Sequence, residues 1–188
     1  IEININIDSV QCFKIDKALF KSDKDILLFN KYIPPRNSIH MRQDIFEEIE
    51  NCLLDNNYAE HHTVIVGDLN AHTSMLNDYV ELDAEVLQEL NIRNVGETLG
   101  RSKHCTVNRA NSDTKKSDLH GRKIIEICKN SGLCILNGRL NGDREGKFTT
   151  VQNACIDYVI ADPSALQLLD SLDIEDFDPL FSDVHNKV

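Results

Sequence analysis

The sequence predicts a single mixed α/β domain, and three observations support this. Short apolar runs of strand length, several of them β-branched, alternate with amphipathic segments of helical period. No internal repeat, low-complexity tract or linker divides the 188 residues. With 41% hydrophobic residues, a chain of this length can bury one core. We therefore expect one domain over residues 1–188.

The first half of the chain contains three expected strands and one helix. Residues 10–15 and 25–33 have strand composition, and the second run ends at two prolines. Residues 63–66 form a β-branched run that stops at Gly67, which is typical of a buried strand followed by an open loop. Residues 41–55 predict a helix, because one face collects its apolar residues Ile45, Phe46, Ile49, Cys52 and Leu53.

The second half continues the alternation. We expect a short helix at residues 82–90 and a polar loop at 91–116, long enough to be either functional or disordered. A helix should follow from Ser117 or Asp118 to about residue 130 and stop at Gly132. Residues 133–136, 148–151 and 155–160 predict strands, and Asp162-Pro163 should open a last helix.

The composition limits the possible functions. The formal net charge of −11 repels a polyanion and argues against non-specific nucleic-acid binding. Such a charge most often serves solubility, but it also suits a carboxylate site that binds a divalent cation. No apolar run reaches membrane-spanning length, so we expect no membrane partner. The six cysteines form no CxxC pair, which predicts a reduced, intracellular protein, nuclear or cytoplasmic, without structural disulfides.

Three polar clusters lie at or near strand ends. Asp68 and Asn70 follow the run at 63–66, where a carboxylate beside an amide can bind metal or water; the alternative is a simple Gly-Asp turn. Asp157 interrupts an apolar strand and needs a partner if it is buried, unless that strand is half exposed. Asp183 and His185 offer an anion and a base near the chain end, or belong to a disordered tail.

The order of these motifs carries more information than any one of them. Tyr32-Ile-Pro, Gly67-Asp-Leu-Asn, Ile156-Asp-Tyr-Val and Ser182-Asp-x-His together resemble the motifs of the endonuclease/exonuclease/phosphatase superfamily. The runs at 109–113, 121–127, 132–139 and 146–149, with Asn37-Ser38, look like its non-LTR retrotransposon endonuclease branch. The resemblance implies a DNase I-like, four-layer α/β/β/α fold: a two-sheet β-sandwich flanked by helices.

The resemblance also implies a phosphodiesterase that depends on Mg²⁺ or Mn²⁺ and uses activated water to hydrolyse nucleic acid. DNA is the favoured substrate over RNA. Asp68 and Asn70 would position the water and the scissile phosphate, and Tyr32 would contact a phosphate oxygen. His185 would bind the phosphate or act as acid/base, with Asp157 fixing its tautomer and raising its pKa. Asp183 would be a metal-side carboxylate. The further implied phosphate-binding residues are Arg109 and Arg139.

Two departures from the family pattern qualify this prediction. Val184 separates Asp183 from His185, whereas the family commonly has these residue types adjacent. The family's opening strands carry an Asn and a metal-binding Glu. These strands have no counterpart before Ile1 and are missing here. We therefore expect a domain that is partial at its N-terminus, holds metal weakly and has little or no activity by itself. A reverse transcriptase domain in the parent polyprotein is an implied partner.

Two other functions remain open at the level of sequence. One is an inactive, domesticated remnant that serves as an interaction module, which the acidic charge and the partial front favour. The other is a phosphatase acting on inositol phosphates or lipids, against which the motif series at 109–149 argues.

Overall fold

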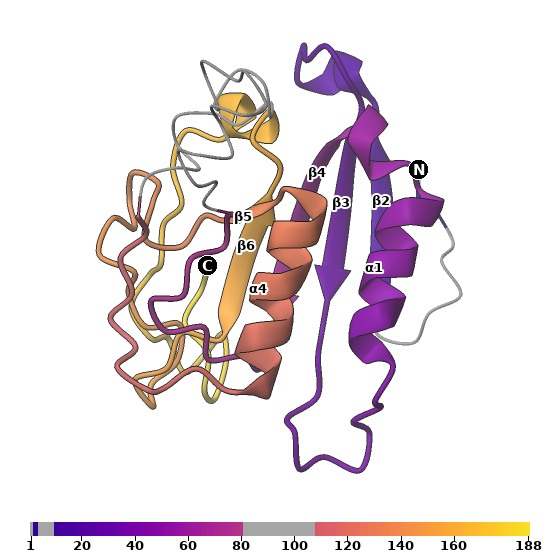
Figure 1. Cartoon of the computed structure of the whole chain (residues 1–188). Coiled ribbons are helices and arrows are strands. Elements are labelled where there is room, and N and C mark those ends of the chain that lie inside the picture. The colour runs from indigo at the N-terminus through magenta and orange to yellow at the C-terminus, as the bar shows by residue number, and fades with distance from the viewer. Residues whose placement is uncertain (1, 4–9, 81–107) are drawn as a thin grey trace, which may run out of the picture.

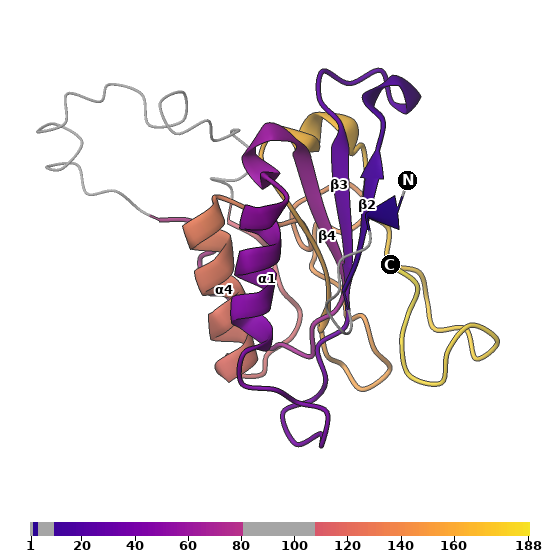
Figure 2. The same ribbon diagram turned by 90° about the vertical axis from the view of Figure 1, so that its right-hand side faces the viewer.

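The computed structural model describes residues 2–3, 10–80 and 108–188. Their strands form a six-stranded sheet in the order β1-β2-β3-β4-β6-β5, with two α-helices on one face (Figures 1 and 2). The strands are β1 (Glu2–Ile3), β2 (Val10–Ile15), β3 (Ile26–Lys31), β4 (His62–Asp68), β5 (Cys134–Ile135) and β6 (Asp157–Ala161). The helices are α1 (Ile45–Asp55), α4 (Leu119–Ser131) and the 3-10 helices η1 (Lys17–Leu19), η2 (Tyr58–Glu60) and η3 (Ala165–Leu168).

The pairing of the central strands brings two carboxylates together. β3 and β4 are parallel, whereas β4 and β6 are antiparallel with Asp68 directly opposite Asp157. The last residue of β4 and the first of β6 therefore lie at the same end of the sheet. Side chains opposite each other on paired strands have Cβ atoms about 5 Å apart. The predicted site residues of these strands become neighbours although 88 other residues separate them in sequence.

The core lies between the sheet and the two helices. α1 buries the five apolar residues predicted for its inner face, and α4 buries Ile124, Ile125, Ile127 and Cys128. They pack against buried residues of the central strands, among them Leu27, Phe29, Ile65 and Ile160. α4 begins after the predicted cap Asp118, whose side chain accepts from the amide of Gly121, and ends at Gly132 with φ +68°.

The second face of the sheet has a different cover. A smaller apolar cluster there joins Ile26, Val64 and Ala161 to residues of the connecting segments, including Leu136 and Leu166. In the described part of the chain this layer consists of loops and short turns, and the regular strands all belong to one sheet. The mixed α/β fold is confirmed. Among residues 10–80 and 108–188, the second hydrogen-bonded sheet that the resemblance implies is represented by isolated bridges.

Several local predictions need correction. Residues 148–151 form no strand, because a turn returns the chain so that the amides of Thr149 and Thr150 both bond the carbonyl of Ala154. The last helix is only the 3-10 helix η3. Cys134 is disulfide-bonded, so the expectation of no structural disulfide is wrong there, whereas four buried cysteines are free: Cys12, Cys52, Cys128 and Cys155. The helix expected at 82–90 lies outside the described residues.

No helix in the described ranges is long and apolar enough to span a membrane.

Candidate metal centre and catalytic site

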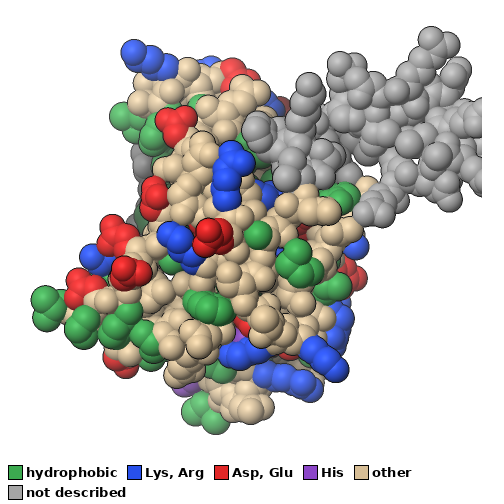
Figure 3. Space-filling view, turned by 90° about the vertical axis from the view of Figure 1, so that its left-hand side faces the viewer, with side chains coloured by type: hydrophobic (Ala, Val, Ile, Leu, Met, Phe, Trp, Pro, Cys, Tyr) green, Lys and Arg blue, Asp and Glu red, His purple; other side chains and the backbone are tan. Residues whose placement is uncertain are grey.

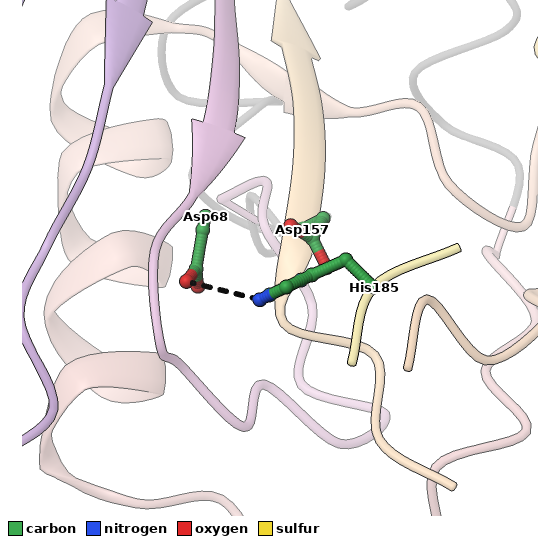
Figure 4. Close-up of side chains that lie close together, drawn as sticks. All are labelled: Asp68, Asp157 and His185. Carbon is green, nitrogen blue, oxygen red and sulfur yellow. Dashed lines mark hydrogen bonds and ion pairs between the residues drawn. The ribbon is translucent and has the colours of Figure 1, made fainter. Parts of the chain in front are cut away.

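Three of the predicted residues meet at the end of β4 and β6. One potential ligand atom each from Asp68, Asp157 and His185 lies within 4.8 Å of the other two (Figure 4). Asp68 ends β4, Asp157 begins β6, and His185 comes from the C-terminal segment. All three side chains are half-buried, so they can reach a ligand while being held by the fold.

Local backbone contacts position Asp68. The carbonyl of Asp68 accepts from the amide of Ile33 at 2.9 Å, which joins the loop after β3 to the end of β4. Gly67 precedes Asp68 with φ +141°, and a Cβ there would lie 2.0 Å from the carbonyl oxygen of Lys31. Only glycine permits this close approach of β3 and β4. Strand packing therefore requires the glycine that precedes Asp68.

Asn70 sits beside Asp68 in the left-handed region, with φ +43°. Its backbone amide donates to Oδ1 of Asp68, and its Nδ2 donates to Oδ2 of Asp68 and to the carbonyl of Ile33. These bonds turn the amide nitrogen toward Asp68, so Oδ1 of Asn70 is directed elsewhere. The predicted pairing of carboxylate and amide is present, and it is rigidly held.

His185 is oriented by Asp157. The Nδ1–H of His185 donates to Oδ2 of Asp157 at 3.0 Å, and Nε2 faces Oδ2 of Asp68 at 3.8 Å. The second distance is too long for a hydrogen bond. The geometry therefore fixes the proton of a neutral ring on Nδ1 and leaves Nε2 able to meet another group.

Two residues without a predicted role, Ser182 and Thr149, hold this arrangement. Ser182 Oγ accepts from the amides of Val184 and His185, which closes the turn that carries the imidazole. Thr149 Oγ1 accepts from the amides of Ile156 and Asp157, which orders the start of β6. The first residue of the Ser-Asp-x-His motif was a visible signal for Ser182. Nothing in the sequence alone connected Thr149 with residue 157.

The electrostatics of the cluster shift two pKa values. Burial raises the pKa of Asp68, and the nearby charge of Asp157 adds to this against the lowering effect of hydrogen bonds from Asn70. For His185, burial lowers the pKa, but the hydrogen bond to Asp157 and the neighbouring carboxylates outweigh it, so the net pKa is raised. The shift of Asp68 moves its pKa toward neutral pH, and the shift of His185 favours the protonated imidazole; perturbed pKa values of this kind are common where acid/base chemistry occurs.

Tyr32 and Asp183 lie outside the three-residue cluster. Tyr32 is exposed and immediately precedes Ile33, whose backbone bonds both Asp68 and Asn70. It lines a cavity of about 520 Å³ with Pro34, and none of the three cluster residues lines that cavity. Asp183 is exposed, and its charge contributes to the raised pKa of His185.

The two arginines expected to contact phosphate lie in the interior instead. The guanidinium of Arg139 forms a bidentate pair with Asp78, at 2.6 and 2.8 Å, and both side chains are almost fully buried. Arg109 is also buried and donates to Oγ1 of Thr73 and the carbonyl of Ser74. The structure therefore does not bring these cations to the cluster, and their contacts support the fold.

The donor set fits a hard divalent cation. Two carboxylates face each other across β4 and β6, and Mg²⁺ and Mn²⁺ prefer oxygen ligands. Two protein carboxylates leave most of an octahedral shell to water and substrate oxygens, which is the usual pattern for Mg²⁺. Burial that raises the pKa of Asp68 also favours a bound cation, because the cation compensates the desolvated charge.

Comparison with known proteins gives a match to a solved structure. No family model and no curated protein matches the chain. A solved structure, the endonuclease domain of TRAS1, a telomere-specific non-LTR retrotransposon, superposes with a TM-score of 0.55 at 17% sequence identity. The match covers 95% of this chain but spans only 60% of the length of that domain. The chain thus has the DNase I-like fold of a non-LTR retrotransposon endonuclease domain.

Proposed function

We propose that the chain is the catalytic part of a metal-dependent phosphodiesterase that hydrolyses nucleic acid. The observation that carries this proposal is the convergence of Asp68, Asp157 and His185 within 4.8 Å, on a nuclease fold. The two carboxylates supply a cation site and a base. The imidazole, oriented through its Nδ1 proton, supplies a hydrogen-bond donor to a phosphate oxygen.

Each residue has a distinct task in this reaction. Asp68, whose pKa is raised, accepts the proton of the attacking water, and Nδ2 of Asn70 donates to Oδ2 of Asp68 and so holds that carboxylate in place. Nε2 of protonated His185 donates to a phosphate oxygen, while Asp157 holds Nδ1 and stabilises the imidazolium. A divalent cation at the carboxylates, when bound, neutralises charge that develops on the phosphate.

The surface charge suits a polyanion at this end of the molecule despite the net charge of −11. Three exposed cations lie just before or within the first turn of α4: Lys115, Lys116 and Arg122. α4 starts at the end of the sheet where β4 finishes (Figure 1). On the face shown in Figure 3, basic side chains gather at the lower end, apart from an acidic edge. Local attraction there can oppose the overall repulsion.

The test is nicking of supercoiled plasmid DNA with Mg²⁺ or Mn²⁺, with chelator as the blank. We expect slow but metal-dependent nicking that Asp68→Ala, Asn70→Ala and His185→Ala each reduce by roughly 10² or more. Asp55→Asn, an exposed carboxylate at the end of α1, serves as the matched control and should keep the wild-type rate.

Other results would point to the alternative functions. Release of phosphate from inositol phosphates without nicking of DNA would replace the nuclease with a phosphatase. A chain that binds no cation and cuts neither substrate would be an inactive remnant that retains the fold.

A further inference from the structure

α4 makes close contacts with the segment that follows Asn70. Asp118 exchanges two hydrogen bonds with His72: its amide donates to the carbonyl of His72, and its Oδ1 accepts from the amide of His72. Gly121 packs so tightly here that a Cβ would lie 1.9 Å from the carbonyl oxygen of His72. The first turn of the helix is therefore fixed directly against the exit of β4.

Within this contact, His120 reaches Asn70 itself. Nδ1 of His120 lies 3.1 Å from the carbonyl oxygen of Asn70. A carbonyl can only accept, so Nδ1 must carry the proton and donate. The imidazole is 1% exposed and packs edge-on against Phe46 of α1, with ring centroids 5.3 Å apart. The ring has little room to rotate, which makes this donor a fixed one.

The environment of Nε2 of His120 indicates which contact explains a polar ring at this position. Nε2 of His120 is buried and has no hydrogen-bond partner within the part of the chain that the structure describes. A buried polar atom without a partner costs stability. An apolar side chain at this position would avoid the cost, so the contact with Asn70 is what the polar ring contributes.

Asn70 needs such support because of its backbone. A non-glycine residue at φ +43° is strained and persists only where its surroundings hold it. Asp68 and Ile33 fix its amide and side chain, and His120 is the partner of its carbonyl. Releasing the carbonyl lets the peptide rotate, which moves the side chain of Asn70 away from Asp68.

We infer that His120 is a positioning residue that acts through Asn70 and sets the geometry of the amide groups that hold the Asp68 carboxylate. The inference rests on the proposed function for its effect on catalysis, but the contact can be tested without any activity. His120 touches neither Asp68 nor Asp157 in any described contact, so its influence must pass through the Asn70 peptide.

The first experiment measures hydrogen exchange of the Asn70 amide protons by NMR in the folded chain. His120→Leu removes the donor and should speed exchange at least tenfold, while His120→Asn, whose Nδ2 can take the place of Nδ1, should restore protection. His62→Leu is the matched control: His62 is buried at the opposite end of β4 and bonds Ser164 and Asp23. It should leave the exchange of Asn70 unchanged. Equal exchange in His120→Leu and the wild type would overturn the inference.

The second experiment measures nicking. His120→Leu should lower kcat about tenfold with KM within about twofold, because misplacement of a catalytic group lowers the rate more than the binding. The same substitution in an Asn70→Ala background should cost nothing further, since both changes act on one interaction. An equal loss in that background contradicts the inference. If the wild type cuts no DNA, the proposed function fails, and the exchange result alone decides the role of His120.

Discussion

At the scale of residues, the site depends on which side chains share protons. Asp157 holds the Nδ1 proton of His185, and Asp68 lies 3.8 Å from Nε2, so the imidazole stands between two carboxylates. The sequence predicted Asp68, Asn70, Asp157 and His185 because each motif joins a polar residue to a strand end or loop. It could not predict the burial of Arg109, because no local pattern distinguishes an arginine on the surface from one inside.

The pair of His185 and Asp157 makes a pH-dependent prediction. Asp157→Asn should lower the pKa of His185 toward or below its ordinary value of 6.5. Burial lowers this pKa, and the substitution removes the carboxylate whose hydrogen bond and charge raise it. NMR titration of the His185 ring protons measures this directly. A pKa that stays raised in Asp157→Asn would assign the shift to Asp68 and Asp183 instead.

The same shift has a consequence for stability. A pKa that is raised on folding adds stability below the unfolded-state value of about 6.5, and that stability is lost as the pH rises through the folded-state pKa. The difference in melting temperature between the wild type and Asp157→Asn should therefore be largest near pH 6 and shrink above the folded-state pKa. A difference that grows with pH would contradict the assignment.

At the scale of elements, the site exists because β3, β4, β6 and α4 end or begin at one place. The strand cores at residues 10–15 and 63–66 and the two helices were predictable, since their apolar periodicity is strong. The strand expected at 148–151 was not recognisable as a turn. Its Thr149-Thr150 pair has β-propensity, but tertiary contacts with Ala154 and residues 184–186 override that preference.

The close approach of β3 and β4 predicts a difference between two glycine substitutions. Gly67→Ala forces a Cβ to within 2.0 Å of the carbonyl of Lys31, whereas Gly132→Ala meets no atom within 4 Å and suffers only from its φ of +68°. We expect Gly132→Ala to cost about 1 kcal/mol of unfolding free energy. Gly67→Ala should cost more, about 3 kcal/mol, because the backbone must move. Urea unfolding measures both, and equal losses would argue against the described strand spacing.

At the scale of the whole molecule, the two faces of the sheet are covered unequally. The helical face is closed, whereas on the other face Ile15, Leu28, Val66 and Val159 are only partly buried. Leu19 and Phe20, at the end of η1, are more than half exposed. An apolar surface of this kind favours association.

This face predicts the behaviour of the isolated chain in solution. We expect reversible self-association at micromolar concentration, which light scattering would detect and which Leu19→Ser with Phe20→Ser should reduce. Leu54→Ser, at an equally exposed position of α1 on the helical side, is the matched control and should change little. A monodisperse wild type with a sharp, reversible melt would contradict this view of the face.

We propose that Asp68 and Asp157 hold a divalent cation beside His185, although the three residues come from distant parts of the sequence. Titration of the ¹⁵N-labelled chain with Mn²⁺ tests it most directly, because a paramagnetic ion broadens resonances near its binding position. We predict that the signals of Asp68, Asn70, Asp157 and His185 broaden first, and that Asp68→Asn abolishes this selectivity. Broadening spread evenly over the acidic surface, or unchanged by Asp68→Asn, would show that the cluster is no metal centre.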